Sequence, residues 1–146
     1  MAKKPFEITL NLVPKNIVIG IGCKRGTACE VVEKLVSKCL ETANIDINRV
    51  CAVATIDIKA DEKGLLEFCE KYGLKLFTYT AEELMNVEGI FTKSEFVLLQ
   101  TGTDNVCERS VVKHGGKLII PKTAENGVTV AVGELPVTLD FAKEIL

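Results

Sequence analysis

The sequence has little of several features that mark large classes of protein. It has one histidine, and its six cysteines include no C-x-x-C pair, so the closely spaced ligands of a structural zinc site are missing. The formal net charge of −2 argues against a strongly basic nucleic-acid binder. No apolar run approaches the ~20 residues of a membrane-spanning helix, and the first residues lack the apolar block and cleavage site of a signal peptide. We therefore expect a soluble, cytoplasmic protein without a metal site, and without nucleic-acid or membrane partners.

The remaining composition is that of an ordinary folded chain. The 146 residues are 47% hydrophobic, which is enough to bury a core without disulfides or metals. No internal repeat, low-complexity tract or interdomain linker is evident, so residues 1–146 are expected to form a single domain. Cys39 and Cys69 fall on the apolar faces of predicted helices and Cys51 falls in a predicted strand, so these thiols are expected in the core.

Strands and helices alternate along the chain. Residues 17–21 are continuously apolar, as in a strand buried on both faces. Thr27 and Glu30 form a capping-box pattern that predicts a helix start at Thr27, followed by four turns with an apolar stripe. The later predicted elements are strand 50–55, helix 61–72 ending at Gly73, strand 74–79, a short helix after Thr80 capped with Glu83, a loop with one helical turn over 86–102, helix 103–114, and strands 117–122 and 128–135.

This order predicts an α/β fold. Strand–helix–strand units imply right-handed crossovers and a parallel sheet covered on both faces. Asn126-Gly127 indicates a tight hairpin, which adds at least one antiparallel strand. The expected architecture is a three-layer α/β/α arrangement with a mainly parallel mixed sheet and a C-terminal β-hairpin.

Ligands of such folds bind where the strands end and the following loops begin, and "GCKRGT" is the first segment expected there. Its glycines can simply serve a strand-to-helix turn. Alternatively, the helix start and the cations Lys24 and Arg25 bind an anion. The segment fits neither the P-loop nor the dinucleotide fingerprint. A helix start and cations can also activate Cys23 as a thiolate, but a nucleophile usually needs a base, and the lone His114 is expected at a helix end.

Three further segments are expected at the same edge, namely "TIDIKADE", "TGTDNVCE" and the stretch near "PKTAENG". In "TIDIKADE", Asp57 and Lys59 alternate with apolar residues, which predicts an extended segment that presents an acid and an amine on one face, with Thr55 adding a hydroxyl. The alternative is a plain polar loop before the helix. In "TGTDNVCE", Glu108 fits the return half of a capping box from Asn105 better than a catalytic group.

Taken in order, "GIGCKRGT", "ATIDIKADEKGL", "TGTDNVCERSVV" and "KTAENGVTVAVGE" resemble the C-terminal domain of the CbiG family, the cobalt-precorrin-5A hydrolases of anaerobic cobalamin biosynthesis. The stand-alone CobE proteins are similar to the same domain. The resemblance implies that residues 16–136 form this domain and that residues 1–15 are a linker-like segment leading into it. The implied reaction opens a δ-lactone of the corrin precursor and releases acetaldehyde.

The resemblance also implies a set of site residues. The substrate is a macrocycle ringed with carboxylates, so cations and helix starts are expected at the rim of its site. Asp57 or Glu62 is expected as the catalytic acid/base. The expected substrate-binding residues are Gly22, Cys23, Lys24, Arg25, Gly26, Thr27, Thr55, Lys59, Gly102, Glu108 and Lys122. Cys23 is then a packing residue rather than a nucleophile.

The same resemblance implies no protein-bound metal or cofactor, because the substrate carries its own cobalt. The implied partners are the corrinoid intermediate and either the N-terminal domains of CbiG enzymes or other enzymes of the cobalamin pathway. Three functions remain open at this point: the hydrolase or its substrate-processing domain, a non-catalytic corrinoid-binding or transfer module like CobE, and a nucleotide- or phosphate-binding domain.

Overall fold

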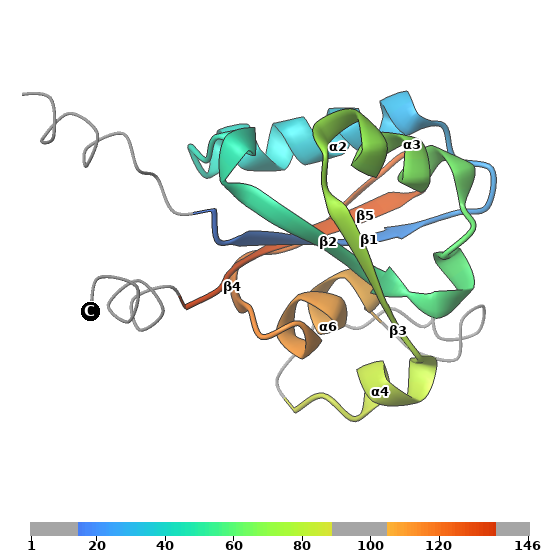
Figure 1. The fold of residues 1–146 in the computed structure, drawn as a ribbon, viewed down its shortest axis with the longest axis vertical. Coiled ribbons are helices and arrows are strands. Elements are labelled where there is room, and N and C mark those ends of the chain that lie inside the picture. Colours follow the sequence, from blue (N-terminus) through green and yellow to red (C-terminus); the bar gives the residue numbers. More distant parts are fainter. Residues whose placement is uncertain (1–14, 89–104, 137–146) are drawn as a thin grey trace, which may run out of the picture.

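A five-stranded mixed sheet forms the centre of the molecule in a computed structural model that describes residues 15–88 and 105–136 (Figure 1). The strand order is β3-β2-β1-β5-β4, in which β1, β2 and β3 are parallel and β5 is antiparallel to both of its neighbours. The strands are β1 (Ile17–Cys23), β2 (Val50–Ile56), β3 (Lys75–Tyr79), β4 (Lys117–Glu125) and β5 (Val128–Glu134). The predicted mixed, mainly parallel sheet is confirmed.

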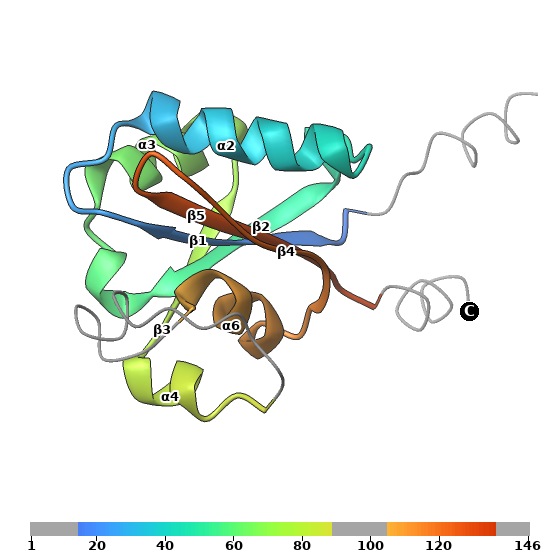
Figure 2. The same ribbon diagram turned by 180° about the vertical axis from the view of Figure 1, so that it is seen from behind.

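Helices cover both faces of this sheet (Figures 1 and 2). Helices α2 (Cys29–Thr42) and α3 (Lys63–Tyr72) pack on one face, and α6 (Val106–Lys113) with the short α4 (Ala81–Met85) packs on the other. Short 3-10 helices, η1 (Ile47–Arg49) and η2 (Asp57–Lys59), precede and follow β2. The three-layer architecture is as predicted.

Strand β1 lies inside the sheet, which explains its unbroken apolar sequence. Ile17, Ile19 and Ile21 are fully buried in the core beneath α2 and α3. Val18 is fully buried in the second core, which α6 covers. A strand with helices on both sides has no polar face, so its side chains do not alternate in polarity.

The predicted capping box at Thr27 is wrong. The Thr27 hydroxyl donates to the carbonyl of Lys24 at 2.6 Å and so closes the preceding turn instead of capping the helix. Helix α2 begins at Cys29 after Ala28, and no side chain caps it. Its first backbone N–H groups therefore lack the usual side-chain acceptor.

Other local signals give the structures expected of them. Gly73 ends α3 in the left-handed conformation with φ of 66°, and Thr80 and Glu83 form the predicted capping box of α4. Asn126 and Gly127 both have positive φ, 52° and 82°, as a two-residue hairpin requires. Helix α3 begins two residues later than expected, at Lys63, because η2 occupies the segment after β2. Most of the segment 86–102, including Gly102, lies outside the described residues.

The start of β1 and the end of β5 lie side by side. The backbone N–H of Leu135 donates to the carbonyl of Asn16 at 2.8 Å, and the Asn16 side-chain amide donates to the carbonyl of Leu135 at 3.1 Å. The described chain therefore enters and leaves the sheet at one place, beside the start of β1 (Figure 1).

Candidate functional site

Three of the expected segments meet at the edge of the sheet where the parallel strands end. The loop of residues 22–27, here called the glycine loop, joins β1 to α2. The backbone N–H of Lys24 in this loop donates to the carbonyl of Gly127 in the β4–β5 turn at 3.0 Å. On its other side, the Arg25 guanidinium donates to the carbonyl of Ile58 in η2 at 3.3 Å. Figures 1 and 2 show this edge from opposite sides.

The start of α6 reaches the same edge from the opposite face of the sheet. A Cβ built on Gly22 would lie 3.8 Å from the Cβ of Val106 and only 2.7 Å from the hydroxyl of Thr129. The Thr129 side chain of β5 would thus have to move for a larger residue at position 22, whereas the contact with α6 is an ordinary one. The Gly22 signal in the sequence reflects packing around the loop.

Glu62 connects the glycine loop to α3. Its Oε1 accepts a hydrogen bond from the backbone N–H of Gly26 at 2.7 Å, and its side chain is 4% exposed. Gly26 has φ of 83°, a conformation that favours glycine. Gly64, two residues after Glu62, packs so tightly that a Cβ there would lie 2.0 Å from the carbonyl oxygen of Thr27. The first turn of α3 thus fixes the loop at two points.

The prediction of an extended segment with Asp57 and Lys59 on one exposed face is wrong. Residues 57–59 form the 3-10 helix η2, in which the N–H of Ala60 donates to the carbonyl of Asp57. Because the chain turns after Ile56, the alternation of the strand stops there. Ile58 is 45% exposed, whereas the Lys59 side chain is buried and Asp57 is exposed.

Arg25 is loosely held in the glycine loop. Its side chain is 66% exposed, and its guanidinium lies 3.8 Å from an oxygen of Asp61 and 3.9 Å from Oε2 of Glu62. Surface ion pairs of this length contribute little to stability. Lys24 beside it is also exposed. Both cations are thus at the surface next to the uncapped start of α2, where an anion is favoured.

Cys23 is half-buried at the end of β1. Burial raises the pKa of its thiol; the charge of Glu62 also raises it, while Lys59 and Arg25 lower it. The net direction is upward, so the protonated thiol is favoured. This geometry supports a packing role for Cys23 and gives no support to a thiolate nucleophile.

Two predicted binding residues are buried with their polar groups used inside the protein. The Thr55 hydroxyl, fully buried in β2, donates to the carbonyl of Ile21 at 2.6 Å. The Glu108 carboxylate accepts from the Asn105 side-chain amide at 2.7 Å and from the backbone N–H of Lys122 at 2.6 Å. Asn105 caps α6 as expected, and Glu108 joins the start of that helix to β4. The Lys122 side chain is half-exposed.

The β4–β5 turn belongs to the stretch near "PKTAENG" that the sequence places at this edge, and it contacts the glycine loop because β5 pairs with β1. The sequence did not indicate the Glu62–Gly26 hydrogen bond, since Glu62 falls inside the predicted helix 61–72. His114 ends α6 as predicted, and its Nδ1 lies 2.6 Å from the hydroxyl of Tyr79.

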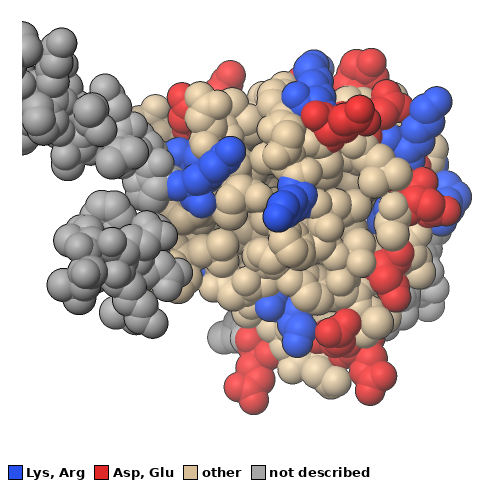
Figure 3. Space-filling view, in the orientation of Figure 1, with Lys and Arg blue, Asp and Glu red and all other residues tan. Residues whose placement is uncertain are grey.

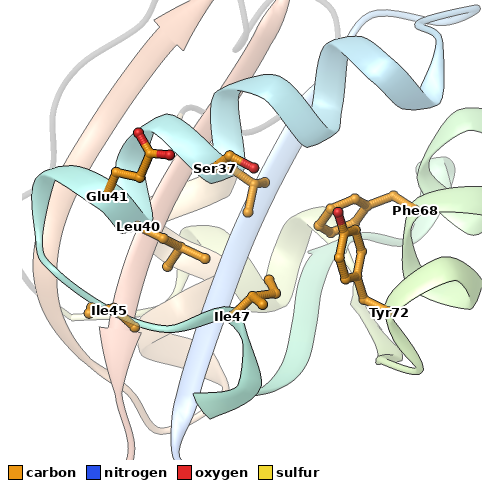
Figure 4. Close-up of a pocket in the computed structure, with 8 residues that line it drawn as sticks. Ser37, Leu40, Glu41, Ile45, Ile47, Phe68 and Tyr72 are labelled. Carbon is orange, nitrogen blue, oxygen red and sulfur yellow. The ribbon is translucent and has the colours of Figure 1, made fainter.

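A pocket of about 180 Å³ lies at the other end of α2 from the glycine loop (Figure 4). Leu40, Ile45, Ile47 and Phe68 give it apolar walls, with Ser37, Glu41 and Tyr72 at its rim. None of the predicted site residues lines it.

Over the face of the molecule seen in Figure 1, basic and acidic side chains are interspersed (Figure 3).

Within residues 15–88 and 105–136 there is no group of three or more His, Cys, Asp or Glu side chains arranged to hold a metal ion. In the same residues, no helix has both the length and the apolar character needed to cross a membrane.

The family model described as "Cobalamin synthesis G C-terminus" matches residues 17–133 of the chain. The chain belongs to this family. The match includes the glycine loop, η2, the start of α6 and the β4–β5 turn. The resemblance drawn from the four sequence motifs is confirmed, and with it a place in cobalamin biosynthesis.

The relatives of the chain fall into two kinds. The cobalt-precorrin-5A hydrolase of Priestia megaterium is 34% identical over 125 residues, which are 84% of this chain and 33% of the hydrolase. The chain thus spans about a third of the length of this relative. The protein CobE of a Sinorhizobium species is 29% identical over 133 residues, 88% of this chain and 86% of CobE.

A solved structure agrees with the fold. The crystal structure of CobE, described as a protein of the cobalamin biosynthetic pathway, superposes with a TM-score of 0.78. It covers 85% of this chain and 93% of that one at 23% identity. This likeness supports the sheet order and the helix layers described above.

Proposed function

We propose that this chain binds a cobalt-bearing corrin precursor and acts in the hydrolysis of cobalt-precorrin-5A as the C-terminal domain of a CbiG-type enzyme. The observation that carries the proposal is the glycine loop, which brings two exposed cations next to an uncapped helix start in a member of this family. Such a loop suits a ligand with carboxylates around its rim. The proposal keeps the expected cytoplasmic location.

In this proposal each group of the edge has a distinct role. Arg25 pairs with a peripheral carboxylate of the macrocycle, Lys24 adds positive charge beside it, and Lys122 adds positive charge from β4 near the start of α6. The exposed Ile58 gives the apolar ring a surface next to these cations. Lys59 is buried in η2 and adds positive electrostatic potential to the same surface.

We assign the acid/base role to Asp57. Its side chain is exposed at the start of η2, so it can approach a ligand held by Arg25, whereas the carboxylate of Glu62 is buried. Hydrolysis adds one water across the lactone C–O bond and leaves a carboxylate and a hydroxyl. The bond between the hydroxyl-bearing carbon and the macrocycle then breaks: the hydroxyl loses its proton and becomes the carbonyl of acetaldehyde, while the macrocycle carbon keeps the electron pair and takes up a proton. Asp57 accepts and returns the protons of these steps, and the cobalt is part of the substrate.

A second function has its own support. The chain covers 86% of the CobE relative but only a third of the hydrolase relative. A domain of CobE size would bind or transfer the corrinoid intermediate without chemistry. Both functions use the same rim of cations, and they differ in whether a product appears.

The deciding experiment incubates the chain with the lactone-bearing cobalt precorrin and measures acetaldehyde. We expect release of acetaldehyde, reduced by about 10²–10⁴-fold in Asp57→Asn, the usual contribution of general acid/base catalysis. Asp61→Asn serves as the control, because it removes an exposed carboxylate of the same surface.

Tight binding of the precursor without acetaldehyde would favour the CobE-like function. Absence of corrinoid binding would contradict both functions. A parallel titration with nucleotide then tests the third function left open by the sequence.

A further inference from the structure

Glu62 is a buried carboxylate with an unusual use. It occupies the N-cap position of α3, yet its side chain makes no capping hydrogen bond to that helix. Its Oε1 instead accepts the N–H of Gly26, 36 residues earlier in the chain. A carboxylate at a helix start is favoured by the helix dipole, so α3 stabilises the charge that fixes the glycine loop.

The second oxygen of Glu62 is placed differently. Oε2 exposes less than 1 Å² and has no hydrogen-bond partner among the described residues. Its ion-pair partner is the Arg25 guanidinium, 3.9 Å away. A buried acceptor without a donor is costly. Such a cost is expected where an arrangement serves a purpose other than stability.

A general acid/base has to come within hydrogen-bond reach of the proton that it transfers. Oε2 of Glu62 is covered, and Oε1 is occupied by the backbone of the loop. The carboxylate can therefore act on a ligand only through the residues that it holds. Those residues are Gly26, whose backbone it fixes, and Arg25, whose side chain it attracts without a close hydrogen bond.

We propose that Glu62 is a positioning residue, which fixes the glycine loop through Gly26 while leaving the Arg25 guanidinium available to a ligand carboxylate. This inference rests on the proposed function for the identity of the ligand, but the fixing of the loop is a property of the protein alone. The two carboxylate oxygens of Glu62 have different functions. Oε1 holds the backbone, and the long contact from Oε2 directs Arg25 without binding it tightly.

The first test needs no ligand. Hydrogen exchange of the Gly26 amide, followed by NMR on ¹⁵N-labelled protein, reports directly on its bond to Glu62. In Glu62→Ala the exchange of this amide should rise by about tenfold or more, as expected on losing a hydrogen bond to a charged group. Glu62→Gln should raise it less, because the side-chain amide keeps an oxygen that can accept the bond.

Two controls separate a local effect from general loosening. Asp61→Ala removes the neighbouring carboxylate, which lies 3.8 Å from Arg25 and does not hold the loop backbone, and it should leave Gly26 exchange unchanged. The amide of Ile19, inside β1, should keep its protection in all variants. If Glu62→Ala does not fold, Glu62→Asp gives the same test, since the shorter side chain cannot keep the 2.7 Å bond. Unchanged Gly26 exchange in the folded variant would overturn the proposal.

The second test uses the cobalt precorrin. A positioning role predicts that Glu62→Gln keeps kcat/KM within about fivefold of the parent, since it keeps the acceptor, whereas replacing a general acid/base costs about 10²–10⁴-fold. It also predicts that Arg25→Ala weakens binding less in a Glu62→Ala background than in the parent, because the two residues act as a unit.

Fully additive losses, or a loss of activity in Glu62→Gln as large as in Asp57→Asn, would overturn the role of Glu62 in positioning Arg25. If the parent binds no corrinoid, the proposed function fails while the exchange result still decides whether Glu62 fixes the loop.

Discussion

Arg25 is held weakly by its neighbours, as the proposed contact with a ligand requires. Its contacts to Ile58, Asp61 and Glu62 are 3.3, 3.8 and 3.9 Å long, and two thirds of the side chain is exposed. The exposed pair with Asp61 contributes roughly 0–1 kcal/mol to stability, and the contact with the buried Glu62 is too long for a hydrogen bond. The guanidinium can therefore leave its present partners at little cost.

We expect Arg25→Ala to weaken binding of the cobalt precorrin by about 1.5–3 kcal/mol, the contribution of a hydrogen bond to a charged group. Arg25→Lys should recover only part of this, because an ammonium lacks the two-pronged geometry of a guanidinium. The affinity should fall as salt rises, since exposed charges are screened over ~8–10 Å near physiological ionic strength. Calorimetric titration at two salt concentrations measures these effects.

Lys71→Ala is the matched control for Arg25. Lys71 is another exposed cation, which lies near the end of α3 and pairs with Glu33. Its removal should leave the affinity unchanged. The thermal stability of Arg25→Ala should stay close to that of the parent. Unchanged affinity, or a large fall in thermal stability, would show that Arg25 is structural and that the ligand sits elsewhere.

The buried thiols give the protein a defined response to alkaline pH. Burial raises the pKa of Cys107 to about 12, from an ordinary value of 9.0, and that of Cys69 to about 11. Above pH 9 the unfolded chain loses these protons while the folded chain keeps them. The free energy of unfolding must therefore fall as pH rises from about 9 toward 12.

Cys107→Ala should flatten this pH dependence by up to about 1.4 kcal/mol per pH unit, the maximum for one titrating group. Urea unfolding at pH 8 and at pH 10.5 measures the change. Cys29→Ala is the comparison, because this thiol lies near the surface and should alter the slope much less. Equal slopes in the parent and in Cys107→Ala would contradict the assignment.

At the scale of elements, α6 and β1 approach each other so closely that the contact at residue 20 has no room for a Cβ atom. A Cβ on Gly20 would lie 1.9 Å from the carbonyl oxygen of Cys107, and this oxygen belongs to the helix backbone. The neighbouring Gly133 of β5 is similar, since a Cβ there would lie 2.2 Å from a methyl group of Val111. These glycines set the spacing between α6 and the sheet.

Gly20→Ala should therefore destabilise the fold by about 3 kcal/mol or more, at the upper end of overpacking effects. Gly73→Ala is the matched control: a Cβ there has open space, and only the positive φ opposes it. That variant should lose only about 1–2 kcal/mol. Chemical denaturation of the two variants compares them. Equal losses would show that α6 can move away from β1 without penalty.

The elements also show where the sequence was informative. Gly73 and Asn126-Gly127 act through their own backbone, and Thr80 and Glu83 act through hydrogen bonds to each other's backbone, so these local patterns predicted the structure correctly. The predicted helix cap at Thr27 failed because the Thr27 hydroxyl donates to a competing acceptor, the carbonyl of Lys24, inside the same turn. The prediction for the segment after β2 failed because apolar and polar residues continue to alternate in the sequence after the strand has ended at Ile56.

For the whole molecule, the fold class followed from the order of strands and helices, but the position of β5 did not. The hairpin signal showed that an antiparallel strand exists without showing that it lies between β1 and β4. Only that position brings the turn at Gly127 against the glycine loop. The candidate site was therefore predictable as a set of segments, whereas the fixing of the loop by Glu62 required the three-dimensional structure.

The pairing of Asn16 with Leu135 has a consequence for how such a domain can be combined with others. Because Asn16 and Leu135 are paired, the two ends of the described fold leave the sheet from one place. That place is the start of β1, at the opposite edge of the sheet from the glycine loop. Ends that lie close together are the geometry that tolerates insertion of a domain into another chain. In this fold such an insertion point would be separated from the candidate site by the length of β1.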